Sequence, residues 1–190
     1  GGFTSSGGTG QLSRANQRSW FQYWVDIYGT DGTSPNERVW YSIFNEPGGS
    51  GQGADWTGTG SALSWVSSRV TLWHEMMKDL ITLIRTKSDA PIIVSSLCLA
   101  QDVLGSVSNL SGGFANVVAE RSNNLANGQA ILDHDDTLMT NPNIIFNVHL
   151  YQNYNAVGRD VYLQEFLLEL ENRGWCVLFG ERGYINQAGV

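Results

Sequence analysis

The sequence predicts an α/β fold built on a parallel sheet. Over 190 residues, four apolar runs rich in β-branched and aromatic residues alternate with four helix-like segments. The connections between these runs are long enough for crossover helices, which join parallel strands. Two of the runs end in a glutamate. Acidic groups are therefore expected at the strand ends where proteins of this class bind ligands.

The expected helices follow from the spacing of apolar residues and from glycine stops. Residues 11–28 carry an aromatic and aliphatic stripe and stop before Gly29. Apolar residues recur at spacings of three and four through 63–84, which is the clearest helical pattern in the chain. A weaker helix is expected over 114–127, closed by Gly128, and an amphipathic helix over 160–173, closed by Gly174.

The expected strands are 39–44, 92–99, 144–151 and the run from 175 into Glu181. The third strand is informative because its residues alternate: Ile144, Phe146, Val148 and Leu150 share one face, and Ile145, Asn147, His149 and Tyr151 share the other. The first face suits packing beneath helices. The second becomes more polar toward its C-terminal end, as the interior of a ligand-binding barrel would.

The two strand-end glutamates, Glu46 and Glu181, indicate a catalytic pair. Glycoside hydrolysis uses one carboxylic acid to protonate the leaving oxygen and one carboxylate at the developing oxocarbenium centre. In retaining enzymes these groups lie about 5 to 5.5 Å apart, and each raises the other's pKa. We therefore expect that separation between Glu46 and Glu181. The alternative is that they are two unrelated acids at strand ends.

Composition and charge exclude several other classes. The formal net charge is −7 and there is no basic cluster, so neither nucleic acid nor an anionic membrane surface is an expected partner. His74 and Glu75 begin a zinc-protease pattern that Lys78 breaks, so a solvated helix face is expected there. The acidic run 133–136 offers metal ligands, yet such a run before a strand is more typical of a solvated loop. No metal or other cofactor is expected.

Three short motifs carry a resemblance: Asn45-Glu46-Pro47, His149-Leu150-Tyr151 and Gly180-Glu181. Together they resemble the site of retaining glycoside hydrolases of family 5, which belong to a clan built on the (β/α)8 TIM barrel. The segment 146–151 is similar to the bacterial β-mannanase branch. The resemblance covers nearly the whole chain and implies one partial catalytic domain over 1–190, from about the fourth to the seventh βα unit of the barrel.

The resemblance also implies a role for each matched residue. Glu46 would be the acid/base and Glu181 the nucleophile. Asn45 would hold the 2-hydroxyl of the sugar, while His149 and Tyr151 would line the subsite at the cleaved bond. The sequence departs from the family at Arg182, where an aromatic residue usually follows the nucleophile.

The expected function is that of a retaining endo-β-1,4-glycanase, with mannan favoured and cellulose or another β-glucan next. Trp56, which lies in a glycine-rich loop without apolar neighbours, is expected to stack on a sugar ring. By resemblance the protein would be secreted, and monomeric when complete. The alternative is a non-catalytic carbohydrate-binding relative or an inactive fragment. A barrel takes about 250 residues, so the chain alone is expected to fold poorly, with Ile145 and Phe179 exposed on its inner face, and to hydrolyse little.

Overall fold

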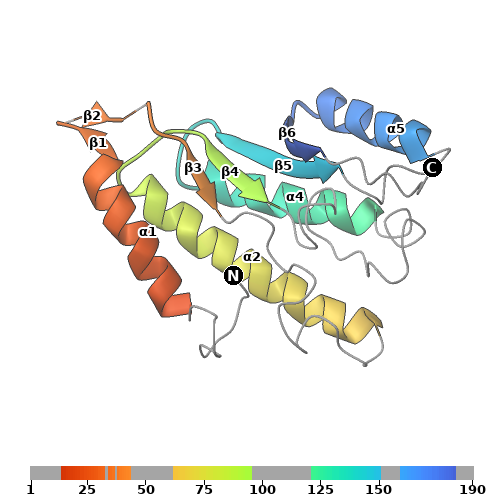
Figure 1. Ribbon diagram of the computed structural model, residues 1–190, viewed down its shortest axis with the longest axis horizontal. Helices are drawn as coiled ribbons and strands as arrows, with labels where there is room; N and C mark the ends of the chain where they lie inside the picture. The colour runs from red at the N-terminus through yellow and green to blue at the C-terminus, as the bar shows by residue number, and fades with distance from the viewer. Residues whose placement is uncertain are drawn as a thin grey trace, which may run out of the picture.

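A computed structural model describes residues 14–32, 34–36, 38–43, 62–95, 121–150 and 159–182. Figure 1 shows helices alternating with strands along the described parts of the chain. The elements are α1 (Arg14–Tyr28), β1 (Thr30–Asp31), β2 (Ser34–Pro35), β3 (Tyr41–Ile43), α2 (Ala62–Arg85), β4 (Ile92–Ser95), α4 (Arg121–Asp136), β5 (Ile144–Leu150), α5 (Arg159–Asn172) and β6 (Cys176–Arg182).

The four longer strands form one parallel sheet in the order β3-β4-β5-β6. Sequence neighbours are also spatial neighbours, and a helix lies in each connection between them (Figure 1). This confirms the α/β class and the parallel sheet. The short strands β1 and β2 form a separate antiparallel pair between α1 and β3.

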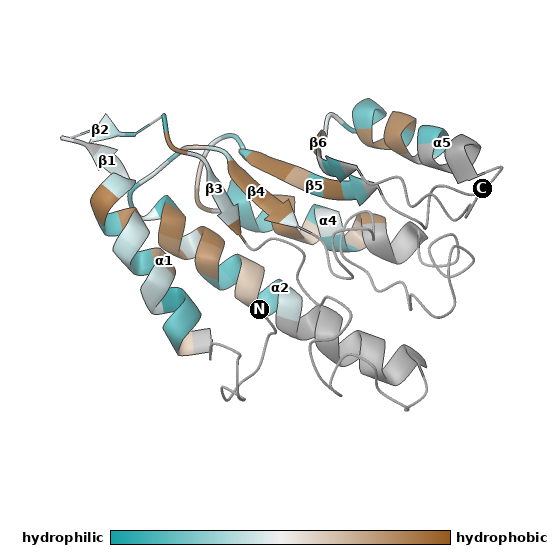
Figure 2. Cartoon of the chain, viewed as in Figure 1, coloured by the Kyte–Doolittle hydropathy of each residue, from teal (hydrophilic) through white to brown (hydrophobic). Residues whose placement is uncertain are grey.

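The core lies between the sheet and its helices. Register places Ile43, Val94 and Phe146 side by side on one face of the sheet. These side chains share one buried cluster with residues of α2, among them Trp73 and Leu80. Figure 2 shows the corresponding hydrophobic segments on β4, β5 and α2. The three-and-four spacing along α2 therefore marks its core face, as predicted.

Helix α4 differs from its expected bounds. The sequence indicated a helix that Gly128 would close, but α4 continues through a buried Gly128 to Asp136. A glycine inside a helix costs about 1 kcal/mol relative to alanine. Ile131, fully buried one turn later, and Asp135 provide tertiary contacts that outweigh this cost.

The acidic run 133–136 forms the last turn of α4 and not a solvated loop. Asp135 is fully buried and accepts hydrogen bonds from Arg85 Nε at 2.7 Å, Arg85 Nη2 at 3.0 Å and the Asn143 amide at 2.9 Å. Arg85 also donates to the carbonyls of Ser88 and Ala90. This ion pair joins the C-terminal ends of α2 and α4 to the segments that lead into β4 and β5.

The two predicted helix stops have different physical causes. Gly174 has a φ of 73°. Its amide donates to the Glu171 carbonyl, and the Trp175 amide donates to the Leu170 carbonyl, which together form a Schellman motif. Gly29 follows the last residue of α1 as expected, but a Cβ there would lie 2.5 Å from the Val25 carbonyl oxygen and 2.9 Å from the Lys87 Cβ, so the close approach of these two groups requires this glycine. None of the described helices has the length and apolarity needed to cross a membrane.

Candidate active site

The carboxyl ends of β5 and β6 bring two of the predicted site residues together. The ladder pairs Val148 with Phe179, then skips one residue of β6 and pairs His149 with Glu181. Gly180 is therefore the extra residue of a bulge. Bulges re-aim side chains next to functional sites, and this one moves Glu181 level with His149.

His149 and Glu181 face each other across this pair of strands. His149 Nδ1 lies 3.9 Å from Glu181 Oε1, and the side chains are 1% and 40% exposed, respectively. A buried imidazole thus lies beside a carboxylate that solvent or a substrate can reach. Such a carboxylate can act as a nucleophile or stabilise a cation, and the imidazole can orient it.

A buried polar network supports His149 from beneath. Asn147, one step earlier on the same face of β5, has its Nδ2 atom 2.9 Å from Ser95 Oγ and 3.1 Å from His149 Nε2. The carbonyl of Ser95 accepts a hydrogen bond from Trp73 Nε1 of α2 at 3.1 Å. The sequence placed Asn147 on the ligand-facing side of the strand but assigned it no role. Its signal was a polar side chain on the same face as His149.

Gly180 has a packing role in addition to its place in the bulge. A Cβ built on Gly180 would overlap Asn147 Oδ1, with Asn147 Cγ at 3.0 Å. The β6 backbone can lie against the Asn147 amide only because residue 180 has no side chain. Gly180, which precedes Glu181, and Asn147, two residues before His149, are thus in direct contact.

The remaining predicted site residues lie outside the described residues: Asn45, Glu46, Trp56 and Tyr151. The expected separation of about 5 to 5.5 Å between Glu46 and Glu181 therefore stays a prediction. The last described residue of β3 is Ile43. Strands β3, β5 and β6 are parallel, so the chain enters the segment containing Asn45 and Glu46 from the end of the sheet that carries His149 and Glu181.

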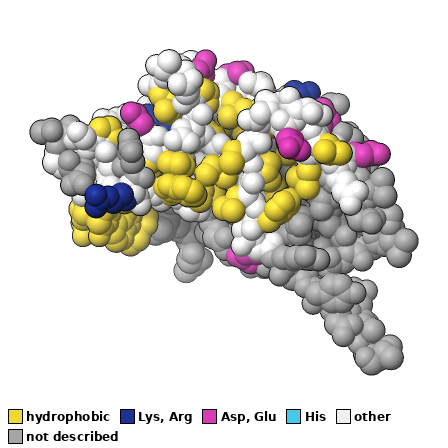
Figure 3. Space-filling model, turned by 90° about the horizontal axis from the view of Figure 1, so that it is seen from above, with side chains coloured by type: hydrophobic (Ala, Val, Ile, Leu, Met, Phe, Trp, Pro, Cys, Tyr) yellow, Lys and Arg dark blue, Asp and Glu magenta, His cyan; other side chains and the backbone are white. Residues whose placement is uncertain are grey.

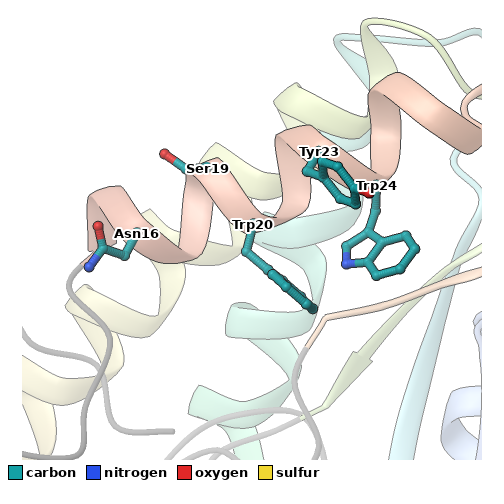
Figure 4. Close-up of a pocket in the computed structure, with 5 residues that line it drawn as sticks. All are labelled: Asn16, Ser19, Trp20, Tyr23 and Trp24. Carbon is teal, nitrogen blue, oxygen red and sulfur yellow. The ribbon is translucent and has the colours of Figure 1, made fainter.

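A shallow pocket elsewhere is unrelated to these groups. It lies on α1 and is lined by Asn16, Ser19, Trp20, Tyr23 and Trp24. Figure 4 shows the Trp20 and Trp24 rings on the same side of the helix, next to each other. Their centroids are 5.5 Å apart in an edge-to-face arrangement. All five residues come from one helix, and none lies at a strand end.

The fold of the described residues is similar to that of two solved enzyme structures. The catalytic domain of a mannanase from Streptomyces sp. SirexAA-E aligns over 91% of this chain and 41% of its own, with a TM-score of 0.53 and 20% identity. A β-mannanase from Streptomyces thermolilacinus aligns over 91% and 44%, with a TM-score of 0.53 and 16% identity. At such identities the likeness concerns the fold. The chain spans less than half the length of either structure.

Comparison of the sequence with protein-family models identifies the family of the chain. No curated protein sequence matches the chain. The model of cellulases of glycosyl hydrolase family 5 matches residues 6–190. Its match extends across every strand of the parallel sheet and includes the ends of β5 and β6, where His149 and Glu181 meet. The four strands are therefore part of a TIM barrel, and the chain belongs to glycosyl hydrolase family 5.

Proposed function

We propose that this chain carries the catalytic pair of a retaining endo-β-1,4-glycanase that acts on mannan. The observation that carries the proposal is the contact at the sheet edge, where Glu181 stands 3.9 Å from the buried His149. Family membership supports hydrolysis of a β-glycan. The fold shared with two Streptomyces mannanases favours mannan over cellulose.

In the proposed reaction, Glu181 attacks the anomeric carbon while the glycosidic C–O bond breaks. Glu46 gives its proton to the departing oxygen, so the leaving sugar is neutral. Water then adds to the anomeric carbon, Glu46 takes its proton, and the bond to Glu181 breaks. Asn45 holds the 2-hydroxyl, His149 and Tyr151 line the cleaved subsite, and Trp56 stacks on a neighbouring sugar ring. The two carboxylates, the sugar and one water molecule supply every reacting atom, so the mechanism requires no cofactor.

The test is release of reducing sugar from β-mannan and from carboxymethylcellulose by the full-length protein that carries this chain. We expect turnover of both or of mannan alone, with higher kcat/KM on mannan. Higher kcat/KM on carboxymethylcellulose would reassign the substrate. Binding to either polymer without any turnover would show that the protein is a non-catalytic carbohydrate-binding relative.

Two variants separate the roles of the carboxylates. Glu181→Ala should abolish turnover on every substrate, because no other group forms the covalent intermediate. Glu46→Ala should spare the first step on aryl glycosides with activated leaving groups, which need no proton. Equal loss in both variants on both substrate types, with the fold intact, would contradict the assigned roles.

The natural setting proposed for this activity is outside the cell, because the polymers are too large to enter it. Activity recovered in the culture medium of the source organism, and removed by an antibody against this chain, would support secretion. Activity confined to washed, lysed cells would oppose it.

A further inference from the structure

The contact between Asn147 and His149 indicates which imidazole nitrogen of His149 carries the proton. Asn147 Nδ2 lies 3.1 Å from His149 Nε2 and 2.9 Å from Ser95 Oγ. All three side chains are buried, with exposures of 5%, 1% and 0%. An amide nitrogen donates hydrogen bonds and accepts none. In this contact His149 Nε2 must therefore accept, and a neutral imidazole that accepts at Nε2 carries its proton on Nδ1.

Nδ1 is the atom that faces Glu181, at 3.9 Å from Oε1. We propose that Asn147 is a positioning residue that sets the tautomer of His149, so that an N–H group and not a lone pair points at the Glu181 carboxylate. The consequence for catalysis rests on the proposed function. A donor at Nδ1 favours the ionised carboxylate and orients it, whereas a lone pair there would repel it.

The amide of Asn147 is packed between β4 and β6. Its Nδ2 group reaches Ser95 on β4, and β4 is tied to α2 through the bond between Trp73 Nε1 and the Ser95 carbonyl. Its Oδ1 atom occupies the space left by the missing side chain of Gly180 and makes no hydrogen bond to the described residues. An amide turned by 180° would present oxygen to His149 Nε2 and would require the opposite tautomer. The position of the imidazole proton therefore tests the proposal directly.

The experiment is long-range ¹H–¹⁵N correlation NMR of the histidine side chains at a pH where they are neutral. The experiment uses the full-length protein that carries this chain, and the spectrum of its His149→Gln variant identifies the signals of His149 by their loss. We expect the Nδ1–H form of His149 in the unmodified protein. The Nε2–H form would overturn the proposal, and this result needs no variant of Asn147.

Asn147→Asp adds a second measurement. A carboxylate in place of the amide can only accept, so the proton should move to Nε2, and the His149 signals should change to the Nε2–H pattern. The matched control is Asn172→Asp at the exposed end of α5, which should leave the pattern unchanged. A His149 tautomer that is the same in Asn147→Asp as in the unmodified protein, with dispersed backbone amide signals in both, would overturn the proposal.

Kinetics distinguish this inference from the proposed function. In an active protein, Asn147→Asp should lower kcat by about tenfold or more with a smaller change in KM. The reason is that Asn147 orients His149, which faces the reacting carboxylate, and does not itself bind the substrate. A full-length protein that shows the Nδ1–H tautomer but hydrolyses no glycan would refute the proposed function and leave the tautomer assignment standing. An active protein with the Nε2–H tautomer would refute the tautomer assignment and leave the proposed function standing.

Discussion

At the residue scale, His74 shows how burial changes a side chain that the sequence indicated as solvated. His74 lies on α2 next to Trp73, and its Nε2 atom is buried without a hydrogen-bond partner. Burial, reinforced by the positive charge of Lys78, lowers the pKa of His74 to about 4 from an ordinary value of 6.5. The folded protein therefore favours the neutral imidazole. Protonation would place an unpaired charge against the core.

This shift predicts a loss of stability in acid. The folded-state pKa of about 4 lies below the unfolded value of 6.5, so the unfolded chain binds a proton first as the pH falls between them. The free energy of unfolding should drop across this window by on the order of 1 to 2 kcal/mol, because the imidazole is only partly buried and solvent screens its charge; His74 makes no further contribution below this window. Urea denaturation at a series of pH values measures this change.

The comparison variant for this experiment is His74→Gln, which should remove most of the drop between pH 6.5 and 4. The matched control is His134→Gln on α4, whose imidazole contacts Thr82 Oγ1 at 2.9 Å. That control should keep the drop. A pH profile for His74→Gln that parallels the unmodified protein would contradict the role of His74.

At the scale of elements, one buried ion pair joins α2, α4 and the starts of β4 and β5. Arg85 and Asp135 have side chains 2% and 0% exposed. Their groups are bonded to each other and to carbonyls and an amide of the neighbouring segments. The pair lies at the amino ends of the strands, opposite the end that carries His149 and Glu181. In barrels of this type the amino end contributes stability while the carboxyl end carries the chemistry.

Removing one partner of this pair should be severely destabilising. Arg85→Leu leaves Asp135 as a buried carboxylate without its counter-ion, and such changes cost about 3 to 5 kcal/mol. The matched control is Arg18→Leu, because Arg18 pairs with Asp79 at 3.4 Å while both side chains are partly exposed. An exposed pair of this kind contributes about 0 to 1 kcal/mol. The free energies of unfolding of the two variants, measured in urea at low protein concentration, should differ accordingly.

The result that would count against this role is a small difference between the two arginine variants. If Arg85→Leu and Arg18→Leu were destabilised by equal amounts, the buried pair would contribute no more than a surface pair. Asp135→Asn is a second test, because the Asn oxygen can still accept from Arg85 Nη2 and the Asn143 amide, whereas its NH2 group faces the Arg85 Nε–H donor and the charge of Asp135 is lost. We expect its destabilisation to lie between those of the two arginine variants.

At the scale of the whole molecule, the described sheet has two open edges. Strands β3 and β6 each have a strand neighbour on one side only within the described residues. Large apolar side chains are exposed near them, including Trp40 at 59% and Phe179 at 47%. Figure 3 shows hydrophobic side chains gathered across the middle of the face seen from above, with acidic groups around them. Open edges with apolar surroundings favour pairing between chains.

We therefore expect the 190-residue chain, studied by itself, to self-associate and to hydrolyse little or no mannan. Sedimentation velocity over a range of concentrations should show the mean mass rising above that of the 20.9 kDa monomer. Mannanase activity measured on the same samples should stay near background, because a site open to water weakens the coupling between its charges. A monodisperse, active monomer would contradict this prediction. An active dimer would indicate that two copies complete one site.

The tertiary structure corrects two expectations, one about the face of the sheet on which Phe179 lies and one about the surroundings of Asp135. Phe179 was expected on the inner face with Ile145, but register pairs it with Val148, on the opposite face of the sheet. Asp135 was expected in a solvated loop but is buried against Arg85. Both errors concern residues whose environment depends on a distant partner. The Phe179 side is set by pairing with β5, and the Asp135 environment is set by a helix 50 residues earlier.

The sequence by itself determined the alternation of helices and parallel strands, the core face of α2, the stop at Gly174 and the strand ends that carry His149 and Glu181. These features depend on local periodicity, on the backbone freedom of glycine and on the order of segments, all of which can be read along the chain. Only the tertiary structure decided that Asn147, Ser95 and Gly180 form the support beneath His149. Those residues lie on three different strands, and they come into contact only when segments distant in the sequence pair in the sheet.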